Sequence, residues 1–230
     1  MLQFINNKIC PFGHRVWLTL LETGTPHQFV DVSITAGEKP EFFTAAYRRA
    51  LGADPASDGK VPVIEEKLAD GTTFTLTESA VIADYLIASK NPSMLPSTPI
   101  ERVRTALFID QCLGKYIPAF YGLLRAQGDA VEPKRAEFHA AVALVGAALD
   151  NCGGPYLLGA RVTIADILLY PFVERLCVLH HYRALQLPTE GAHFASFHRF
   201  CDAFRGRSSA TTTAQPDAFF IAGYEKYANP

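Results

Sequence analysis

One cysteine of the five in this 230-residue chain stands where a thiol can become a nucleophile. Cys10 directly precedes Pro11, and proline suits the first position of a helix because no backbone N–H is needed there. The sulfur would then lie beside unpaired amides at the positive end of the helix dipole, which favours the thiolate. His14 and Arg15, one turn on, can add a cation or point to solvent. We therefore expect a lowered pKa and nucleophilic chemistry at Cys10, although a cysteine so placed can also be inert core.

The other four cysteines, Cys112, Cys152, Cys177 and Cys201, have no such neighbours. The number of cysteines is odd and none is paired at C-x-x-C spacing, since position 13 is Gly13, so a disulfide framework is not expected. The formal net charge of -2, without long runs of one sign, argues against nucleic acid and anionic membranes as partners. No signal-peptide pattern and no membrane-length apolar run is visible. We expect a cytoplasmic protein without a metal, whose partners are small molecules or neutral protein surfaces.

The first half of the chain alternates strand and helix signals. Apolar runs, helical spacing and turn residues predict the order β-α-β-α-β-β-α. The strands are expected at 2–5, 27–32, 63–66 and 74–76, and the helices from Pro11 to before Gly24, at 40–49 and at 78–89. Asp70-Gly71 can supply the positive φ angles of a hairpin turn, so the last two strands should pair antiparallel.

The second half shows no strand pattern and is predicted to be all-α. Residues 90–98 contain Pro92 and Pro96, are followed by Pro99, and show no periodicity. They are the expected linker between a domain at 1–89 and a domain at 99–230. Helices are expected at 100–126, 133–151, 163–180, 194–205 and 216–227. Thr163 and Asp166 have the spacing of a capping box, and Pro171, inside the same helix, should bend it.

Five motifs in order along the chain resemble the cytosolic glutathione transferase family. They are Cys10-Pro11-Phe12 with Arg15, and the segments 39–43, 60–65, 78–86 and 163–176. Within the family the match is to the cysteine-type classes, the omega-like enzymes and dehydroascorbate reductases. The resemblance covers nearly the whole chain, and it implies a thioredoxin-like N-terminal domain, an all-helical C-terminal domain and a site in the cleft between them.

The resemblance implies a glutathione site in the first domain. Val61 would hold the cysteinyl part through its backbone if Pro62 is cis, and Phe12 would lie beside it. The helix starting at Glu78-Ser79 would take the γ-glutamyl end, because its amides suit a carboxylate and Glu78 suits an ammonium group. Two plainer readings remain open: a trans X-Pro bond at a strand start, and a helix merely capped by Thr77.

The lysine that the omega-like pattern uses for the glycyl carboxylate is absent, because Gly37 stands there. Lys39 or Lys60 can substitute, although each can equally be a solvated surface charge. The loop Gly52 to Gly59 is wider than the family usually shows.

For the second substrate, the resemblance implies a pocket at Phe172 and Arg175, one helical turn apart, with Tyr121 and Tyr224 as further candidates. Each aromatic residue can instead be core packing, and Arg175 can simply pair with a carboxylate.

Together these features predict a glutathione-dependent thiol transferase that works by a monothiol route at Cys10. It would reduce mixed disulfides or dehydroascorbate, with conjugation of glutathione to electrophiles as a secondary activity. Glutathione would be the co-substrate, and the resemblance implies a homodimer. The alternative is a non-enzymatic glutathione-transferase-like module that serves protein contacts.

Overall fold

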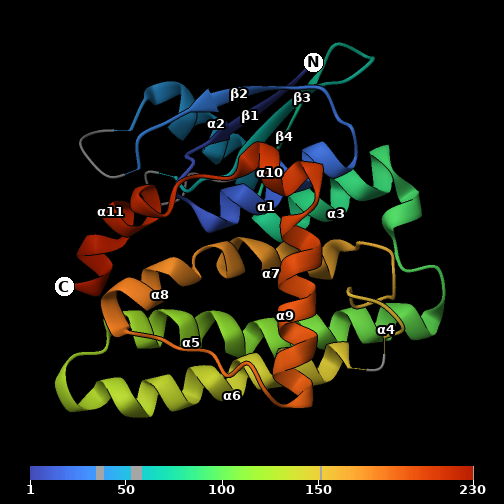
Figure 1. Cartoon of the computed structure of the whole chain (residues 1–230). Coiled ribbons are helices and arrows are strands. Elements are labelled where there is room, and N and C mark those ends of the chain that lie inside the picture. Colours follow the sequence, from blue (N-terminus) through green and yellow to red (C-terminus); the bar gives the residue numbers. More distant parts are fainter. Residues whose placement is uncertain (35–38, 53–58, 151, 230) are drawn as a thin grey trace. The chain divides into compact units, whose positions relative to one another are not determined.

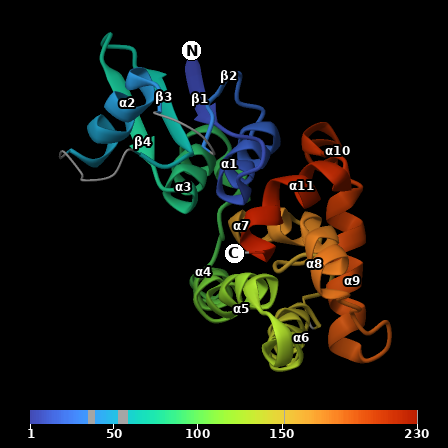
Figure 2. The same cartoon turned by 90° about the vertical axis from the view of Figure 1, so that its left-hand side faces the viewer.

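The computed structural model describes residues 1–34, 39–52, 59–150 and 152–229 of the chain. It divides into two compact units, Met1–Pro92 and Ser93–Pro230, shown in Figures 1 and 2. Each unit has its own core and is described separately.

The first unit is built on a mixed four-stranded sheet in the order β2-β1-β3-β4. Strands β1 and β2 are parallel, whereas β3 runs antiparallel to both β1 and β4. The elements in chain order are β1 (Leu2–Asn6), α1 (Pro11–Glu22), β2 (His27–Asp31), α2 (Glu41–Leu51), β3 (Val63–Lys67), β4 (Thr73–Thr77) and α3 (Ser79–Lys90). The predicted β-α-β-α-β-β-α order is thus confirmed, with element ends within a few residues of expectation.

Alternation along β1 gives the sheet two apolar faces, each covered by helices (Figure 1). Leu2 and Phe4 pack with residues of α1 and α3 on one face. Ile5 packs with Phe43 and Tyr47 of α2 on the other. A one-residue slip of β1 would turn Leu2 and Phe4 away from α1 and α3, so this packing specifies the register of the strand.

The hairpin between β3 and β4 differs in detail from the expected turn. Gly71 has a positive φ of 85°, but Asp70 does not share it. Instead, Asp70 Oδ1 accepts hydrogen bonds from the backbone N–H and the hydroxyl of Thr72, at 2.9 and 2.6 Å. These bonds lower the pKa of Asp70. The antiparallel pairing that the turn predicted is confirmed.

The second unit is all-helical, as predicted. After a short 3₁₀ turn, η1 (Pro92–Met94), its elements are α4 (Pro99–Leu107), the π-helical segment η2 (Phe108–Leu113), α5 (Gly114–Arg125), the 3₁₀ turn η3 (Gly128–Ala130), α6 (Val131–Leu149), α7 (Ile164–Glu174), α8 (Leu176–Arg183), α9 (Ala192–Arg205), α10 (Ser208–Thr213) and α11 (Asp217–Ala228). Among its described residues, the β pairing is limited to two isolated bridges, Tyr156 with Gly159 and Leu158 with Arg161. In the described part of the chain no helix is both long and apolar enough to cross a membrane.

The helix predicted over 163–180 is wrong as a single element, because the structure has two helices there. The break is at Arg175, whose φ and ψ are −88° and 8°. The guanidinium of Arg175 donates to the carbonyl of Pro171 at 2.7 Å, the acceptor that the N–H of residue 175 would use if the helix continued. Pro171 itself lies inside α7.

The start of α7 carries the predicted capping box. The backbone N–H and hydroxyl of Thr163 donate to Asp166 Oδ2 at 2.9 and 2.8 Å, and the N–H of Leu157 donates to Oδ1 at 2.9 Å. Asp166 is buried, and this burial raises its pKa to about 6 against the opposing effect of the three donors. One carboxylate therefore fastens both the first turn of α7 and the loop before it.

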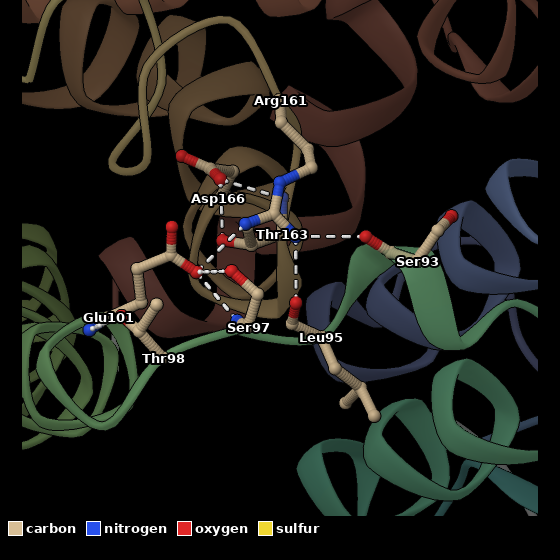
Figure 3. Close-up of polar contacts among 8 residues, drawn as sticks. All are labelled: Ser93, Leu95, Ser97, Thr98, Glu101, Arg161, Thr163 and Asp166. Carbon is tan, nitrogen blue, oxygen red and sulfur yellow. Dashed lines mark hydrogen bonds and ion pairs between the residues drawn. The ribbon is translucent and has the colours of Figure 1, made fainter.

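Arg161, in the same loop, holds the beginning of the second unit (Figure 3). Its guanidinium donates to the carbonyls of Ser93 and Leu95, at 2.8 and 2.7 Å, and to Glu101 at 3.0 Å. Glu101 also accepts from the N–H and hydroxyl of Ser97. The segment that precedes α4 is thereby tied to the loop that precedes α7.

Candidate functional site

Three segments of the first unit meet at one end of its sheet. Because β3 runs opposite to β1 and β4, its beginning lies beside their ends, and Val63 is paired with both Ile5 and Thr77. The Cys10 loop follows β1, Val61 and Pro62 precede β3, and Glu78 follows β4. The sheet topology thus brings the predicted nucleophile close to the residues predicted to bind glutathione.

Cys10 is the N-cap of α1, and two backbone groups contact its sulfur. The N–H of Gly13 donates to Sγ at 3.5 Å, and Sγ is 3.9 Å from the carbonyl oxygen of Val61. Pro11 occupies the first helical turn, as predicted. The side chain is half-buried, so an incoming reagent can still reach it. A helix-terminal amide aimed at a sulfur stabilises the thiolate over the thiol.

Asn7 shapes the loop that presents Cys10, a role that the sequence analysis missed. Its carbonyl accepts from the N–H of Cys10 at 3.1 Å, and its side-chain oxygen accepts from the N–H of Ile9 at 3.1 Å. Its side-chain amide donates to the carbonyl of Val32 at 2.9 Å. The available signal was an asparagine between an apolar strand and the cysteine, because asparagine commonly closes such turns.

His14 and Arg15 are both buried, with 3% and 6% of their surface exposed, so neither points to solvent. The guanidinium of Arg15 lies 5.0 Å from the ring centre of Phe12 and donates to Ser79 Oγ at 3.4 Å. Arg15 therefore links the helix of the cysteine to the start of α3.

The other four cysteines are in a different electrostatic setting. Burial raises the pKa of Cys112 to about 11 and the pKa values of Cys177 and Cys201 to about 12. Burial also raises the pKa of Cys152. All four are therefore thiols at neutral pH, and poor nucleophiles.

The peptide bond between Val61 and Pro62 is cis. The carbonyl of Pro62 accepts from the hydroxyl of Thr77 at 3.1 Å, which ties this bond to the end of β4. Thr77 is engaged there, and the N-cap of α3 is Glu78, whose carboxylate accepts no capping hydrogen bond from the helix. The reading in which Thr77 caps the helix is therefore wrong.

Glu78 has a φ of 70°, one of two positive values among the described non-glycine residues. A β-carbon makes this conformation costly, and residues held in it cluster at functional sites. Its side chain is exposed, whereas the adjacent Ser79 is buried. The first amides of α3 thus have no side-chain cap, and an exposed carboxylate lies beside them. This arrangement can bind a group that carries both a negative and a positive charge.

Lys39 and Lys60 were the two lysines predicted for the glycyl carboxylate, and Lys39 contacts the segment that leads into Val61. Its Nζ donates to the carbonyl of Gly59 at 2.6 Å, two residues before Val61. Lys60 is exposed. Gly37, where the resemblance would place a lysine, lies outside the described residues, as does most of the loop between Gly52 and Gly59.

The four residues predicted for the second substrate are all in the second unit. Phe172 is fully buried and its ring lies edge-to-face with those of Phe120 and Tyr121. Arg175 is also fully buried, its guanidinium 4.3 Å from the ring centre of Phe220. Tyr224 is buried and Tyr121 is half-buried. Of the four, Tyr121 exposes the most surface.

The fold and the site define a class: a thioredoxin-like unit in which a helix-capping cysteine contacts the carbonyl before a cis-proline, followed by an all-helical unit. The model of the glutathione S-transferase N-terminal domain matches residues 9–89, and that of the C-terminal domain matches residues 128–212. The chain belongs to the glutathione transferase superfamily. The family uses glutathione as a co-substrate.

Relatives from several organisms show the same kinship. The chain is 27% identical to glutathione S-transferase DHAR2 of Arabidopsis thaliana over 96% of its own length and 91% of the relative. It is 26% identical to probable glutathione transferase omega-2 of Caenorhabditis elegans over 76% of its length, which is 63% of that protein. Among solved structures, the trimeric glutathione transferase TDR1 of Leishmania superposes with a TM-score of 0.80 at 27% identity, covering 99% of this chain and 49% of that one. The chain thus spans less than two thirds of two of these relatives.

Proposed function

We propose that this protein is a glutathione-dependent thiol transferase of the omega-like or dehydroascorbate reductase-like kind, with Cys10 as its nucleophile. The observation that carries the proposal is the setting of Cys10 Sγ, which is 3.5 Å from the Gly13 amide and 3.9 Å from the carbonyl before the cis-proline. The relatives named for omega and dehydroascorbate reductase classes support it.

The reaction consists of two thiol–disulfide exchanges. The Cys10 thiolate attacks the glutathione sulfur of a mixed disulfide, and the substrate sulfur leaves as a thiolate that takes up a proton. A second glutathione, as its thiolate, then attacks the Cys10–glutathione disulfide and releases glutathione disulfide, which restores Cys10. For dehydroascorbate, two glutathione molecules supply the two electrons and two protons. Gly13 stands three residues after Cys10, so no C-x-x-C resolving thiol is present and a monothiol route is favoured.

Glutathione would bind along the sheet end described above. The backbone of Val61 would pair with the cysteinyl residue as an added strand does. Glu78 and the first amides of α3 would hold the ammonium and carboxylate of the γ-glutamyl end, and Phe12 would border the site. Lys39, already close to Gly59, is a better candidate than Lys60 for the glycyl carboxylate.

For the second substrate we propose Tyr121 as a direct contact. Phe172, Arg175 and Tyr224 are buried and would act mainly by fixing its surroundings. A domain at 1–89 would bind glutathione and one at 99–230 would carry this pocket, with 90–98 as the linker; the division between Pro92 and Ser93 supports this plan. The relative named as cytosolic supports a cytoplasmic location.

The test is glutathione-dependent reduction of hydroxyethyl disulfide and of dehydroascorbate. The wild-type protein should catalyse at least one of them. Cys10→Ala should abolish the activity and leave glutathione affinity, measured by calorimetry, largely intact. Cys201→Ala, at a buried thiol, is the matched control and should stay active. An inactive wild type that does not bind glutathione would instead favour a non-enzymatic module. A Cys10→Ser variant also allows glutathione conjugation to electrophiles to be assayed.

A further inference from the structure

Asn6 and Gly13 meet beneath the turn that carries Cys10. Asn6 ends β1, and its side chain is fully buried. A β-carbon on Gly13 would lie 1.6 Å from Asn6 Oδ1 and 2.3 Å from its Cγ. Any larger residue at position 13 therefore collides with this amide. Glycine is a poor helix former, so its place in the first turn of α1 has a specific cause, which is that it admits Asn6.

The amide of Asn6 is itself unusual. Neither its Oδ1 nor its Nδ2 has a hydrogen-bond partner among the residues that the structure describes. Burying such a group unpaired is unfavourable, and an apolar side chain would fill the space without that cost. The pairing of β1 does not require the amide either, since only the main-chain carbonyl of Asn6 bonds to Val32, at 2.9 Å.

The same glycine donates to the nucleophile, because the Gly13 N–H is 3.5 Å from Cys10 Sγ. We propose that Asn6 and Gly13 form a complementary pair whose fit sets the position of the first turn of α1, and with it the Gly13 amide, against the sulfur of Cys10. Asn6 is then a positioning residue that acts through Gly13. The inference rests on the nucleophilic role proposed above for Cys10.

The experiment follows alkylation of Cys10 by iodoacetamide as a function of pH, with the modified residue assigned by peptide mass mapping. Gly13→Ala should slow the reaction by about tenfold, the effect of losing one charge-assisted hydrogen bond. Asn6→Ala should slow it less, because the turn loses support without a collision. In the double variant the new methyl group occupies the room left by the amide, so most of the lost rate should return.

Gly114→Ala is the matched control, since a β-carbon there meets nothing within 4 Å, and it should alkylate like the wild type. A merely structural pair would lower the unfolding temperature and leave the pH dependence of alkylation unchanged. The proposal instead requires that this dependence move to higher pH in Gly13→Ala and return in the double variant. Should Gly13→Ala fail to fold, the double variant must fold and alkylate faster than Asn6→Ala.

Two results would overturn the proposal. One is wild-type alkylation kinetics in Gly13→Ala, and the other is a double variant that alkylates no faster than the slower of the two single variants that fold. Alkylation needs no glutathione. A wild type that lacks glutathione-dependent activity but shows this pattern of rates would therefore refute the proposed function and leave the pairing of Asn6 with Gly13 standing.

Discussion

At the scale of single residues, the five thiols differ in what surrounds each sulfur. Cys10 is half-buried and receives a helix-terminal N–H. Cys112 and Cys201 are buried, with pKa values raised to about 11 and about 12. Burial disfavours the charged form of a thiol, whereas a donor beside it favours that form. The local setting therefore separates one candidate nucleophile from four inert thiols.

This difference predicts selective alkylation. One equivalent of iodoacetamide at neutral pH should modify Cys10 and leave Cys112, Cys152, Cys177 and Cys201 unmodified. Because burial raises the pKa values of Cys112, Cys177 and Cys201 to about 11 to 12, a moderate increase in pH should not make these three thiols react in the folded protein. Peptide mass mapping provides the measurement, and labelling in denaturant, where all five should react, is the control. Early modification of Cys177 or Cys201 would contradict the assignment.

At the scale of elements, the start of α7 depends on one carboxylate with three donors. Asp166 accepts from Thr163 twice and from Leu157 once, and it is buried. An amide of the same shape offers one acceptor oxygen in place of two, and its NH₂ group would face a donor.

Asp166→Asn should therefore lower the free energy of unfolding by about 1 to 3 kcal/mol, the cost of leaving a buried donor unmet. Urea unfolding followed by circular dichroism measures it. Asp202→Asn is the matched control, because Asp202 lies on the exposed surface of α9 with its side chain 77% exposed. It should change stability by less than about 0.5 kcal/mol. Equal effects of the two substitutions would show that the capping box does not stabilise α7.

Local signals predicted the fold where one residue type dictates the backbone. Pro11 predicted the start of α1, and the spacing of Thr163 and Asp166 predicted the start of α7. The break at Arg175 was not predictable, because it depends on a guanidinium that captures the Pro171 carbonyl, a contact that periodicity does not encode.

Three further features escaped prediction for related reasons. The helix expected over 100–126 contains the π-helical segment Phe108–Leu113. A π-helix has wider turns than an α-helix, and over so short a segment this leaves the apolar pattern of the sequence nearly unchanged. The helix α10 consists of serine, threonine and alanine, and so gave no apolar stripe. At the site, Asn6 gave no signal because its importance depends on the approach of Gly13.

At the scale of the whole molecule, the second unit exposes an apolar stripe on α4. Ile100, Val103 and Leu107 stand at helical spacing with 68%, 67% and 59% of their surface exposed. Apolar side chains gathered on one exposed face are typical of association surfaces. We propose that this stripe forms part of a contact between two copies of the chain.

Light scattering should then give about twice the chain mass of 25.2 kDa for the wild type. Val103→Glu places a charge in the contact and should shift the protein toward the single-chain mass. Ala218→Glu adds the same charge at an exposed position of α11 and should leave the mass unchanged. A wild type that stays a single chain at high concentration would contradict the proposal.

The most direct test of the central claim is mass analysis of the intermediate at Cys10. The wild-type protein, mixed with a glutathionylated peptide and no free glutathione, should gain one glutathionyl group, mapped to Cys10, as the reduced peptide is released. Addition of glutathione should remove the group and yield glutathione disulfide. Peptide reduction without a Cys10 adduct, or undiminished turnover in Cys10→Ser, would contradict the assignment of Cys10 as the nucleophile.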